Sequence, residues 1–247
     1  MKVFIATPTA DGSVKVRYMT SILETLLDLQ GHGIDCRFDT LDGVTVVRAR
    51  NILASRFFAE SAYTHLFFVD SDMQFAGSLC RRMLALDKPL VGAACTKKTL
   101  DLDVLRRHWG GDLSFDDALA IAHQYTLRLP PGPLHISDGV CQVDGFGFGV
   151  ALIRRDALER MVSMGAARLV RNDANTRADG LPHGLYNFFD QLPSPHGDLL
   201  SEDWSFCQRW KEQCGGELWA IVDADIGHIG EMRYGQPYMR KLKHGLA

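Results

Sequence analysis

The chain has 247 residues, of which 46% are hydrophobic and 23% are charged, and its formal net charge is −3. This size and composition predict one large α/β domain or two small ones, and they exclude a disordered or fibrous chain. Sequence-independent binding to nucleic acid is disfavoured, because it depends on an excess of basic residues that neutralise phosphates.

The six cysteines lie in apolar or helical runs and show neither CxxC pairs nor the clustered spacing of zinc ligands. We therefore expect reduced thiols in the core. The first nine residues look like a strand rather than a secretory signal, and no apolar run approaches the roughly 20 residues that a transmembrane helix needs. These features predict a cytoplasmic protein, with peripheral contact to a membrane left open.

Short apolar runs alternate with amphipathic stretches in the first hundred residues. Strands are predicted at residues 3–6, 34–39, 65–69 and 89–95, and helices at residues 16–30, 45–62 and 77–86. This alternation predicts a doubly wound, mostly parallel sheet flanked by helices. In such sheets, ligands bind at the carboxyl ends of the strands.

The second half of the chain is less regular. The pattern predicts a helical stretch at residues 100–129, broken at Gly110 and Gly111, and then a glycine-rich turn followed by an apolar strand at residues 141–153. A long irregular loop is predicted at residues 171–197, a helix at residues 201–214 and a last strand at residues 217–222. No internal repeat or linker divides the chain, so a single domain over residues 1–247 is expected.

Two carboxylates, Asp70 and Asp72, directly follow the fully apolar strand predicted at residues 65–69. In an extended segment, residues i and i+2 project to the same side, so both acids are expected to face one point. Mg²⁺ and Mn²⁺ prefer oxygen ligands and commonly complete their coordination with substrate phosphates. The pattern therefore predicts a metal site; the alternative is a polar strand end with two solvated acids.

A second acid pair, Glu202 and Asp203, opens the predicted helix at residues 201–214. Ser201 can cap that helix, and acids in its first turn oppose the helix dipole, which explains the pair structurally. The functional alternative is that one carboxylate takes the proton from an acceptor hydroxyl as a general base. His228 lies between glycines after the last strand, and it is either structural or an additional metal ligand.

Weaker candidates lie at other element ends. Arg48 and Asn51 share a helix face at i, i+3 spacing, where an arginine can bind a diphosphate; the alternative is a solvated face. The glycines of residues 144–149 would let a sugar or acceptor approach the backbone, or simply form a strained turn. The remaining candidates for nucleotide or phosphate contact are Thr7, Pro8, Ser71 and Lys97.

Taken in order, these elements resemble the GT-A glycosyltransferase superfamily. The large inverting family of bacterial glycosyltransferases carries a similar Ala-Arg-Asn helix, a DxD motif and an acid pair. The Arg-Ala-Arg-Asn string also resembles that of fungal mannan α-1,6-mannosyltransferases, which retain configuration. The matching strings, which span nearly the whole chain, are Ala6-Thr7-Pro8, Arg48-Ala49-Arg50-Asn51, Phe68-Val69-Asp70-Ser71-Asp72, Gly147-Phe148-Gly149 before Leu152-Ile153-Arg154, Ser201-Glu202-Asp203-Trp204 and His228.

The resemblance implies a hexosyltransferase-type enzyme that moves a sugar from a nucleoside-diphosphate sugar, with UDP favoured over GDP, to a hydroxyl of a saccharide or lipid-linked saccharide. Asp70, Asp72 and His228 would hold Mn²⁺ or Mg²⁺ on the donor's diphosphate, and Asp203, next to Glu202, would be the base of an inverting reaction. Residues 1–99 would bind the nucleotide sugar, and residues 100–247 would bind the acceptor and carry the catalytic residues.

Two other functions are compatible with the pattern. A sugar nucleotidyltransferase shares the sheet architecture, but it typically has a glycine-rich, basic loop after the first strand. Here that region has Gly12 and Lys15 but no dense basic loop, which counts against this function. A non-catalytic carbohydrate- or nucleotide-binding module would share the fold, which does not determine function. The presence of Asp70, Asp72, Asp203 and His228 together argues against the loss of activity.

Overall fold

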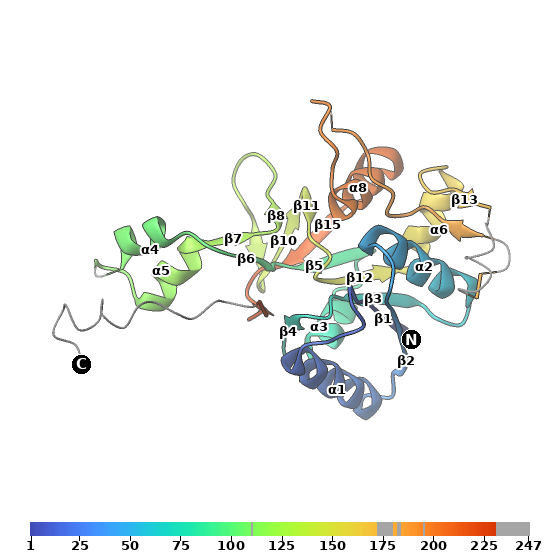
Figure 1. The fold of residues 1–247 in the computed structure, drawn as a ribbon, viewed down its shortest axis with the longest axis horizontal. Coiled ribbons are helices and arrows are strands. Elements are labelled where there is room, and N and C mark those ends of the chain that lie inside the picture. Colours follow the sequence, from blue (N-terminus) through green and yellow to red (C-terminus); the bar gives the residue numbers. More distant parts are fainter. Residues whose placement is uncertain (110, 172–179, 182–183, 195, 231–247) are drawn as a thin grey trace.

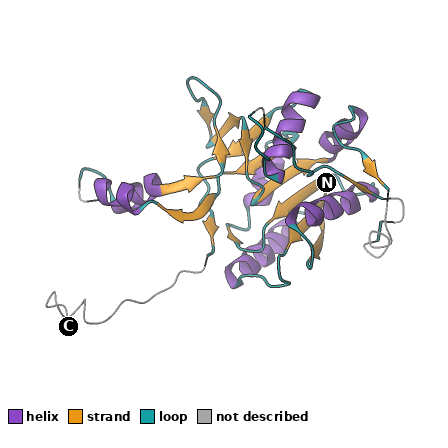
Figure 2. Cartoon of the chain, turned by 45° about the horizontal axis from the view of Figure 1, so that its top comes forward, coloured by secondary structure: helices purple, strands orange, loops and turns teal. Residues whose placement is uncertain are grey.

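The computed structural model describes residues 1–109, 111–171, 180–181, 184–194 and 196–230. In these ranges a central eight-stranded sheet lies between helices on both faces, and a pair of short helices extends away from it at one end (Figure 1 and Figure 2). None of the helices in these ranges combines the length and hydrophobicity that crossing a lipid bilayer requires.

The central sheet has the strand order β2-β1-β3-β12-β5-β15-β10-β9. Strands β2, β1, β3, β5 and β15 run in one direction, whereas β12 and β10 run in the opposite direction. The predicted mostly parallel α/β sheet flanked by helices is therefore confirmed. The strands are β1 (Lys2–Pro8), β2 (Asp35–Leu41), β3 (His65–Val69), β5 (Leu90–Ala93), β9 (Ile136–Ser137), β10 (Val140–Val143), β12 (Val150–Arg154) and β15 (Leu218–Ile221).

Alternate residues of the inner strands pack against opposite helical layers. On one face, Phe4 and Phe68 belong to the core cluster formed with α2 (Val46–Ala59), α6 (Arg155–Ser163) and α8 (Glu202–Gln208). On the other face, Ile5 and Phe67 pack with α1 (Val16–Gly31) and α3 (Leu79–Ala85). Both faces of the inner strands are thus buried, which explains why these strands are apolar at every position.

Two short helices lie on either side of the break predicted at Gly110 and Gly111, and Asp101 and Ser114 cap them with their side-chain oxygens. The helical prediction is wrong at the end of the segment, because residues 123–125 and 127–128 form short strands. Gly110 lies outside the described residues. We call residues 96–125 the excursion, because paired strands carry its helices away from the sheet (Figure 1). Its elements are β6 (Thr96–Leu100), α4 (Leu102–His108), α5 (Phe115–Ala122) and β7 (His123–Tyr125).

The predicted helix at residues 201–214 consists of α8 and a π-helical continuation at Arg209–Gln213. The part of the predicted loop at residues 171–197 that is described contains one short strand, which pairs with β13. Short strand pairs also hold the remaining turns; they join β11 (Gly145–Phe146) to β8 (Leu127–Arg128), β13 (Leu169–Val170) to β14 (Leu185–Tyr186), and β16 (Gly227–His228) to β4 (Met73–Gln74).

Candidate active site

The aspartates of the DxD motif lie on a turn rather than on an extended strand. Strand β3 ends at Val69, the Asp70 N–H donates to the Gly149 carbonyl at 2.9 Å, and the Met73 N–H donates to the Asp70 carbonyl at 3.1 Å. The extended geometry expected for this segment is therefore wrong. The two carboxylates have different partners: Asp70 contacts Arg50, and Asp72 contacts Lys98 and His228.

Arg50 of α2 is the centre of the acidic cluster. Its side chain is only 2% exposed, and its guanidinium lies 2.9 Å from Asp70, 2.8 Å from Asp203 and 3.4 Å from Glu202. Burial opposes the charged form, but these carboxylates outweigh it and hold the pKa of Arg50 above its ordinary value. One buried cation thus joins the end of β3 to the start of α8.

The two acids of α8 have opposite protonation tendencies. Burial, assisted by the neighbouring charge of Asp203, raises the pKa of Glu202 to about 7. Burial also opposes ionisation of Asp203, but Arg50 and the N–H of Phe148, at 3.2 Å, hold its pKa below the ordinary value. Asp203 is therefore a carboxylate at neutral pH, and Glu202 is partly protonated. Ser201 makes no side-chain cap to α8, so the expected cap is wrong.

His228 reaches Asp72 because β16 pairs with β4, a contact that is confirmed by the Ile229 N–H bound to the Asp72 carbonyl at 2.8 Å. His228 Nε2 lies 3.4 Å from Asp72 Oδ1, and Lys98 Nζ contacts the other carboxylate oxygen. Burial opposes ionisation of Asp72, but hydrogen bonds from His228 and Lys98 lower its pKa to about 2. The hydrogen bond to Asp72 in turn raises the pKa of His228.

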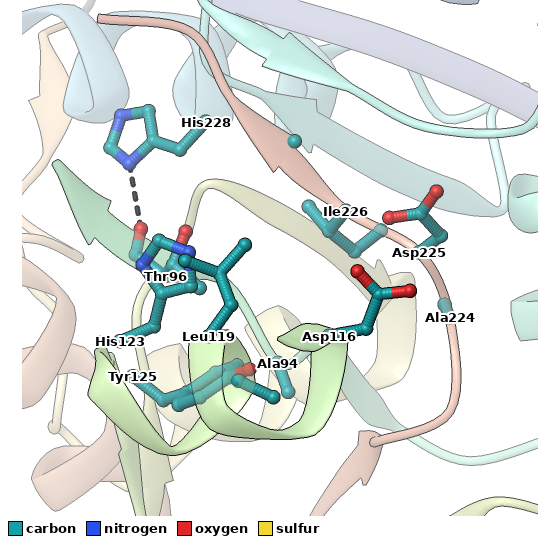
Figure 3. A pocket seen from close by; sticks show the side chains of 12 residues that line it. Ala94, Thr96, Asp116, Leu119, His123, Tyr125, Ala224, Asp225, Ile226 and His228 are labelled. Atoms are coloured by element: carbon teal, nitrogen blue, oxygen red, sulfur yellow. Dashed lines mark hydrogen bonds between the residues drawn. The ribbon is translucent and has the colours of Figure 1, made fainter. Parts of the chain in front are cut away.

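The donor set around Asp72 fits a divalent cation. His228 Nδ1 lies 2.7 Å from the Thr96 carbonyl (Figure 3), and because a carbonyl only accepts, Nδ1 carries the hydrogen. The hydrogen bond to Asp72 described above therefore comes from the imidazolium, through Nε2–H. Loss of that proton would leave a lone pair on Nε2 for a cation beside Asp72, as in metal sites whose histidine is oriented by a backbone carbonyl. No group of three or more potential metal ligands occurs within the described residues, so a cation here would take further ligands from substrate phosphates.

Four other residues that were predicted to contact the nucleotide lie at the end of β1, in the DxD turn and in the first turn of α2. Thr7 and Pro8 are buried at the end of β1, and Thr7 Oγ1 lies 2.5 Å from the hydroxyl of Tyr18. Ser71 is half-buried in the DxD turn, and Arg48 is half-buried in the first turn of α2. Their roles in nucleotide binding stay predictions.

The surroundings of two further predicted residues, Asn51 and Lys97, do not favour the contact with a diphosphate that was predicted for them. Asn51 is 3% exposed; its amide donates to Asp190 at 2.8 Å and accepts from the Phe189 N–H at 2.7 Å. It supports a loop, and these contacts do not favour the predicted contact with a diphosphate. Lys97 is exposed on β6, where side chains alternate between faces, so the next residue, Lys98, is the one that contacts Asp72.

Arg50 is a site residue to which sequence reasoning assigned no role. A signal for Arg50 exists: it shares the buried face of α2 with Ala54 and Phe57, at i+4 and i+7. A charged residue in an apolar stripe needs buried partners of opposite charge.

The glycines of residues 144–149 pack closely against other side chains of the protein. A Cβ on Gly145 would lie 2.4 Å from the ring of Trp204, and one on Gly147 would lie 2.7 Å from Thr126 Oγ1. Close packing against Trp204 of α8 explains Gly145, and close packing against Thr126 explains Gly147. The alternative of a sugar against the backbone is not needed for either glycine. Trp204 is half-buried, and the centre of its ring lies 4.8 Å from the guanidinium carbon of Arg128.

The chain matches no protein-family model, and comparison with curated proteins finds no match. Among solved structures it is similar to A197 from STIV, with 17% identity, a TM-score of 0.50, and 94% of this chain and 87% of that chain covered. A lower score of 0.43 relates it to a mutant of Drosophila β1,4-galactosyltransferase 7 crystallised with manganese, UDP-Gal and xylobiose, with 14% identity and 97% and 73% covered. An inositol-1-phosphate CTP transferase from T. maritima scores 0.40, with 10% identity and 100% and 97% covered.

At these identities the similarity concerns the fold. The chain has the GT-A-type α/β fold, in which a mostly parallel sheet is flanked by helices on both faces. The particular activity has to be argued from the site.

Proposed function

We propose that this protein is a metal-dependent glycosyltransferase that moves a sugar from a nucleoside-diphosphate sugar to a hydroxyl of a saccharide acceptor, with UDP favoured over GDP as the carrier. The observation that carries the proposal is the meeting of Asp70, Glu202 and Asp203 on one buried arginine, beside the Asp72–His228 pair. Gathering three partly buried carboxylates around one buried cation is costly for a purely structural cluster.

In this proposal Asp72 and His228, with Asp70 nearby, hold Mn²⁺ or Mg²⁺ on the donor's diphosphate. When bound, the cation offsets the negative charge that develops on the departing nucleoside diphosphate. Lys98, which contacts Asp72, adds a second positive charge at the same place. The predicted ligand Asp70 is held by Arg50, so we assign the principal protein ligands as Asp72 and His228.

Asp203 is the proposed general base of an inverting reaction. Its carboxylate is ionised at neutral pH and fixed by Arg50 and by the Phe148 N–H, so it is available to accept the proton of an acceptor hydroxyl. Glu202, with its pKa near 7, keeps the negative charge of the pair low when it is protonated. Arg50 positions both carboxylates.

Donor hydrolysis in the absence of acceptor tests the proposal. The protein is incubated with UDP- and GDP-sugars in Mn²⁺, Mg²⁺ or EDTA, and release of nucleoside diphosphate is measured. We expect metal-dependent release that falls about 100-fold or more in Asp72→Ala, since transition-state charge stabilisation of this kind is worth several kcal/mol. The matched control is Asp103→Ala, whose side chain is 84% exposed.

Release that continues in EDTA or in Asp72→Ala would reject the metal site. Formation of pyrophosphate from a nucleoside triphosphate and a sugar phosphate would instead identify a sugar nucleotidyltransferase. Saturable binding of a nucleotide sugar without turnover under any of these conditions would identify a binding module.

A further inference from the structure

A cavity of about 410 Å³ lies between the excursion and the segment that leads to β16 (Figure 3). One wall is a face of α5 and the start of β7, because Asp116, Leu119, Ala120 and His123 follow one another at the i, i+3, i+4, i+7 spacing of a helix face. The opposite wall is residues 224–228. The volume falls within the roughly 300–1,000 Å³ range of small-ligand sites.

The lining combines hydrogen-bond acceptors with apolar side chains. Asp116 and Asp225 lie on the same side of the cavity, with Leu119 beside them and Tyr125 at another wall (Figure 3). Nδ1 of His123 is buried and has no hydrogen-bond partner within the described residues. The desolvation of this nitrogen is uncompensated, and because it has almost no accessible surface, a ligand in the cavity meets other atoms of His123.

This chemistry selects for hydroxyl groups and against phosphates. Carboxylates accept hydrogen bonds from hydroxyls, whereas the described lining holds no lysine or arginine that would bind a phosphate. The apolar side chains Leu119 and Ile226 suit the C–H face of a sugar ring. A neutral sugar satisfies both parts of the lining, and a nucleotide or an anionic sugar does not.

The cavity adjoins the candidate active site. His228 is one of the residues that line it, and Nε2 of the same ring lies 3.4 Å from Asp72 Oδ1. The excursion is also tied to the turn that holds Asp203: the Thr126 N–H donates to the Cys95 carbonyl, and the Gly147 N–H donates to the Thr126 carbonyl, both at 2.8 Å. A ligand in the cavity therefore lies next to His228, which is assigned to the metal site.

We propose that this cavity binds a neutral sugar unit of the acceptor, at a distance from the hydroxyl that reacts. The inference rests on the proposed glycosyltransferase function and extends it to the acceptor. It assigns Asp116, Asp225 and His123 to acceptor recognition, and it gives the excursion its role as one wall of the acceptor site.

Calorimetric titration of the full chain with tetrasaccharides tests the cavity without a donor. The probes are cellotetraose, chitotetraose and mannotetraose, with tetragalacturonic acid as an anionic comparison. We expect saturable binding of at least one neutral probe, weakened about tenfold or more by Ala120→Trp, which fills the cavity, and by Asp225→Asn, which removes a charged acceptor. Ile121→Trp, on the same helix at a position that is 50% exposed and outside the lining, is the matched control and should bind as the wild type does.

Three results would overturn the cavity assignment: no saturable binding of any neutral probe at millimolar concentration, unchanged binding in Ala120→Trp, or tighter binding of tetragalacturonic acid than of the neutral probes. Donor hydrolysis separates this outcome from failure of the proposed function. If the wild type and Ala120→Trp hydrolyse donor equally and differ in acceptor KM, both proposals hold. If the wild type hydrolyses no donor, the function fails, whereas the titration still decides the cavity.

Discussion

The buried guanidinium of Arg50 contacts three carboxylates of the candidate site. Its two terminal nitrogens contact Asp70, Glu202 and Asp203, and its guanidinium carbon lies 5.6 Å from the centre of the Phe148 ring. Substitution leaves three carboxylates next to one another in a desolvated place. Removing one partner of a buried ion pair is far more costly than removing an exposed one.

We expect Arg50→Met to lower the free energy of unfolding by about 3–5 kcal/mol, measured by urea denaturation at neutral pH. Arg50→Lys should lose less, since it keeps the charge but not the planar fork that contacts several carboxylates. Arg106→Met, at a site where the side chain is 82% exposed, is the control. Equal stability of Arg50→Met and this control would show that the cluster does not depend on the guanidinium.

At the scale of elements, the sheet and α8 meet through β11. A Cβ on Gly92 of β5 would lie 2.4 Å from the ring of Phe146, which is fully buried. Phe146 stacks on Phe148, with ring centres 5.4 Å apart, and the N–H of Phe148 binds Asp203. The position of the carboxylate of Asp203 therefore depends on the close packing of Phe146 against Gly92 of β5.

Gly92→Ala should lower the free energy of unfolding by about 1–3 kcal/mol, because an added methyl group in a packed core forces its neighbours out of place. Gly31→Ala is the matched control: Gly31 is the last residue of α1, and a Cβ there meets no atom within 4 Å. Urea denaturation measures both. A Gly92→Ala protein as stable as the control would mean that β11 can shift freely.

At the scale of the whole molecule, the sheet carries a buried titratable group. His65 opens β3, is 7% exposed, and pairs with Arg154 of β12. Burial, followed by the charge of Arg154, lowers the pKa of His65 to about 4 from 6.5. The unfolded chain therefore binds a proton at a higher pH than the folded chain does, and folding stability falls as the pH decreases from about 6.5 to about 4.

This linkage amounts to roughly 3 kcal/mol, which is present above pH ~6.5 and lost by pH ~4. We expect the free energy of unfolding of His65→Gln to decrease less than that of the wild type over this interval, because glutamine does not gain a charge. Urea denaturation at several pH values gives the comparison, and His135→Gln, at an exposed site, should follow the wild type. Identical profiles for His65→Gln and the wild type would place the acid sensitivity elsewhere.

The sequence by itself determined the alternation of strands and helices, the apolar strand β3, and the acids that follow it and that open α8. These features depend on local periodicity and on residue types at element ends, which a single sequence contains. The turn of the DxD segment departed from this pattern, because the Met73 N–H binds the Asp70 carbonyl and ends the extended conformation after β3. Residues 123–125 and 127–128 also departed from it, since they form short strands where helix was predicted.

Only the tertiary structure decided which side chains meet. Arg50 and Asp203 are 153 residues apart in the chain, and His228 reaches Asp72 only through the pairing of β16 with β4. The cavity likewise needs α5 and residues 224–228 to lie opposite each other. Contacts of this kind depend on how the chain is brought together over long distances, whereas periodicity reports only on the nearest few residues.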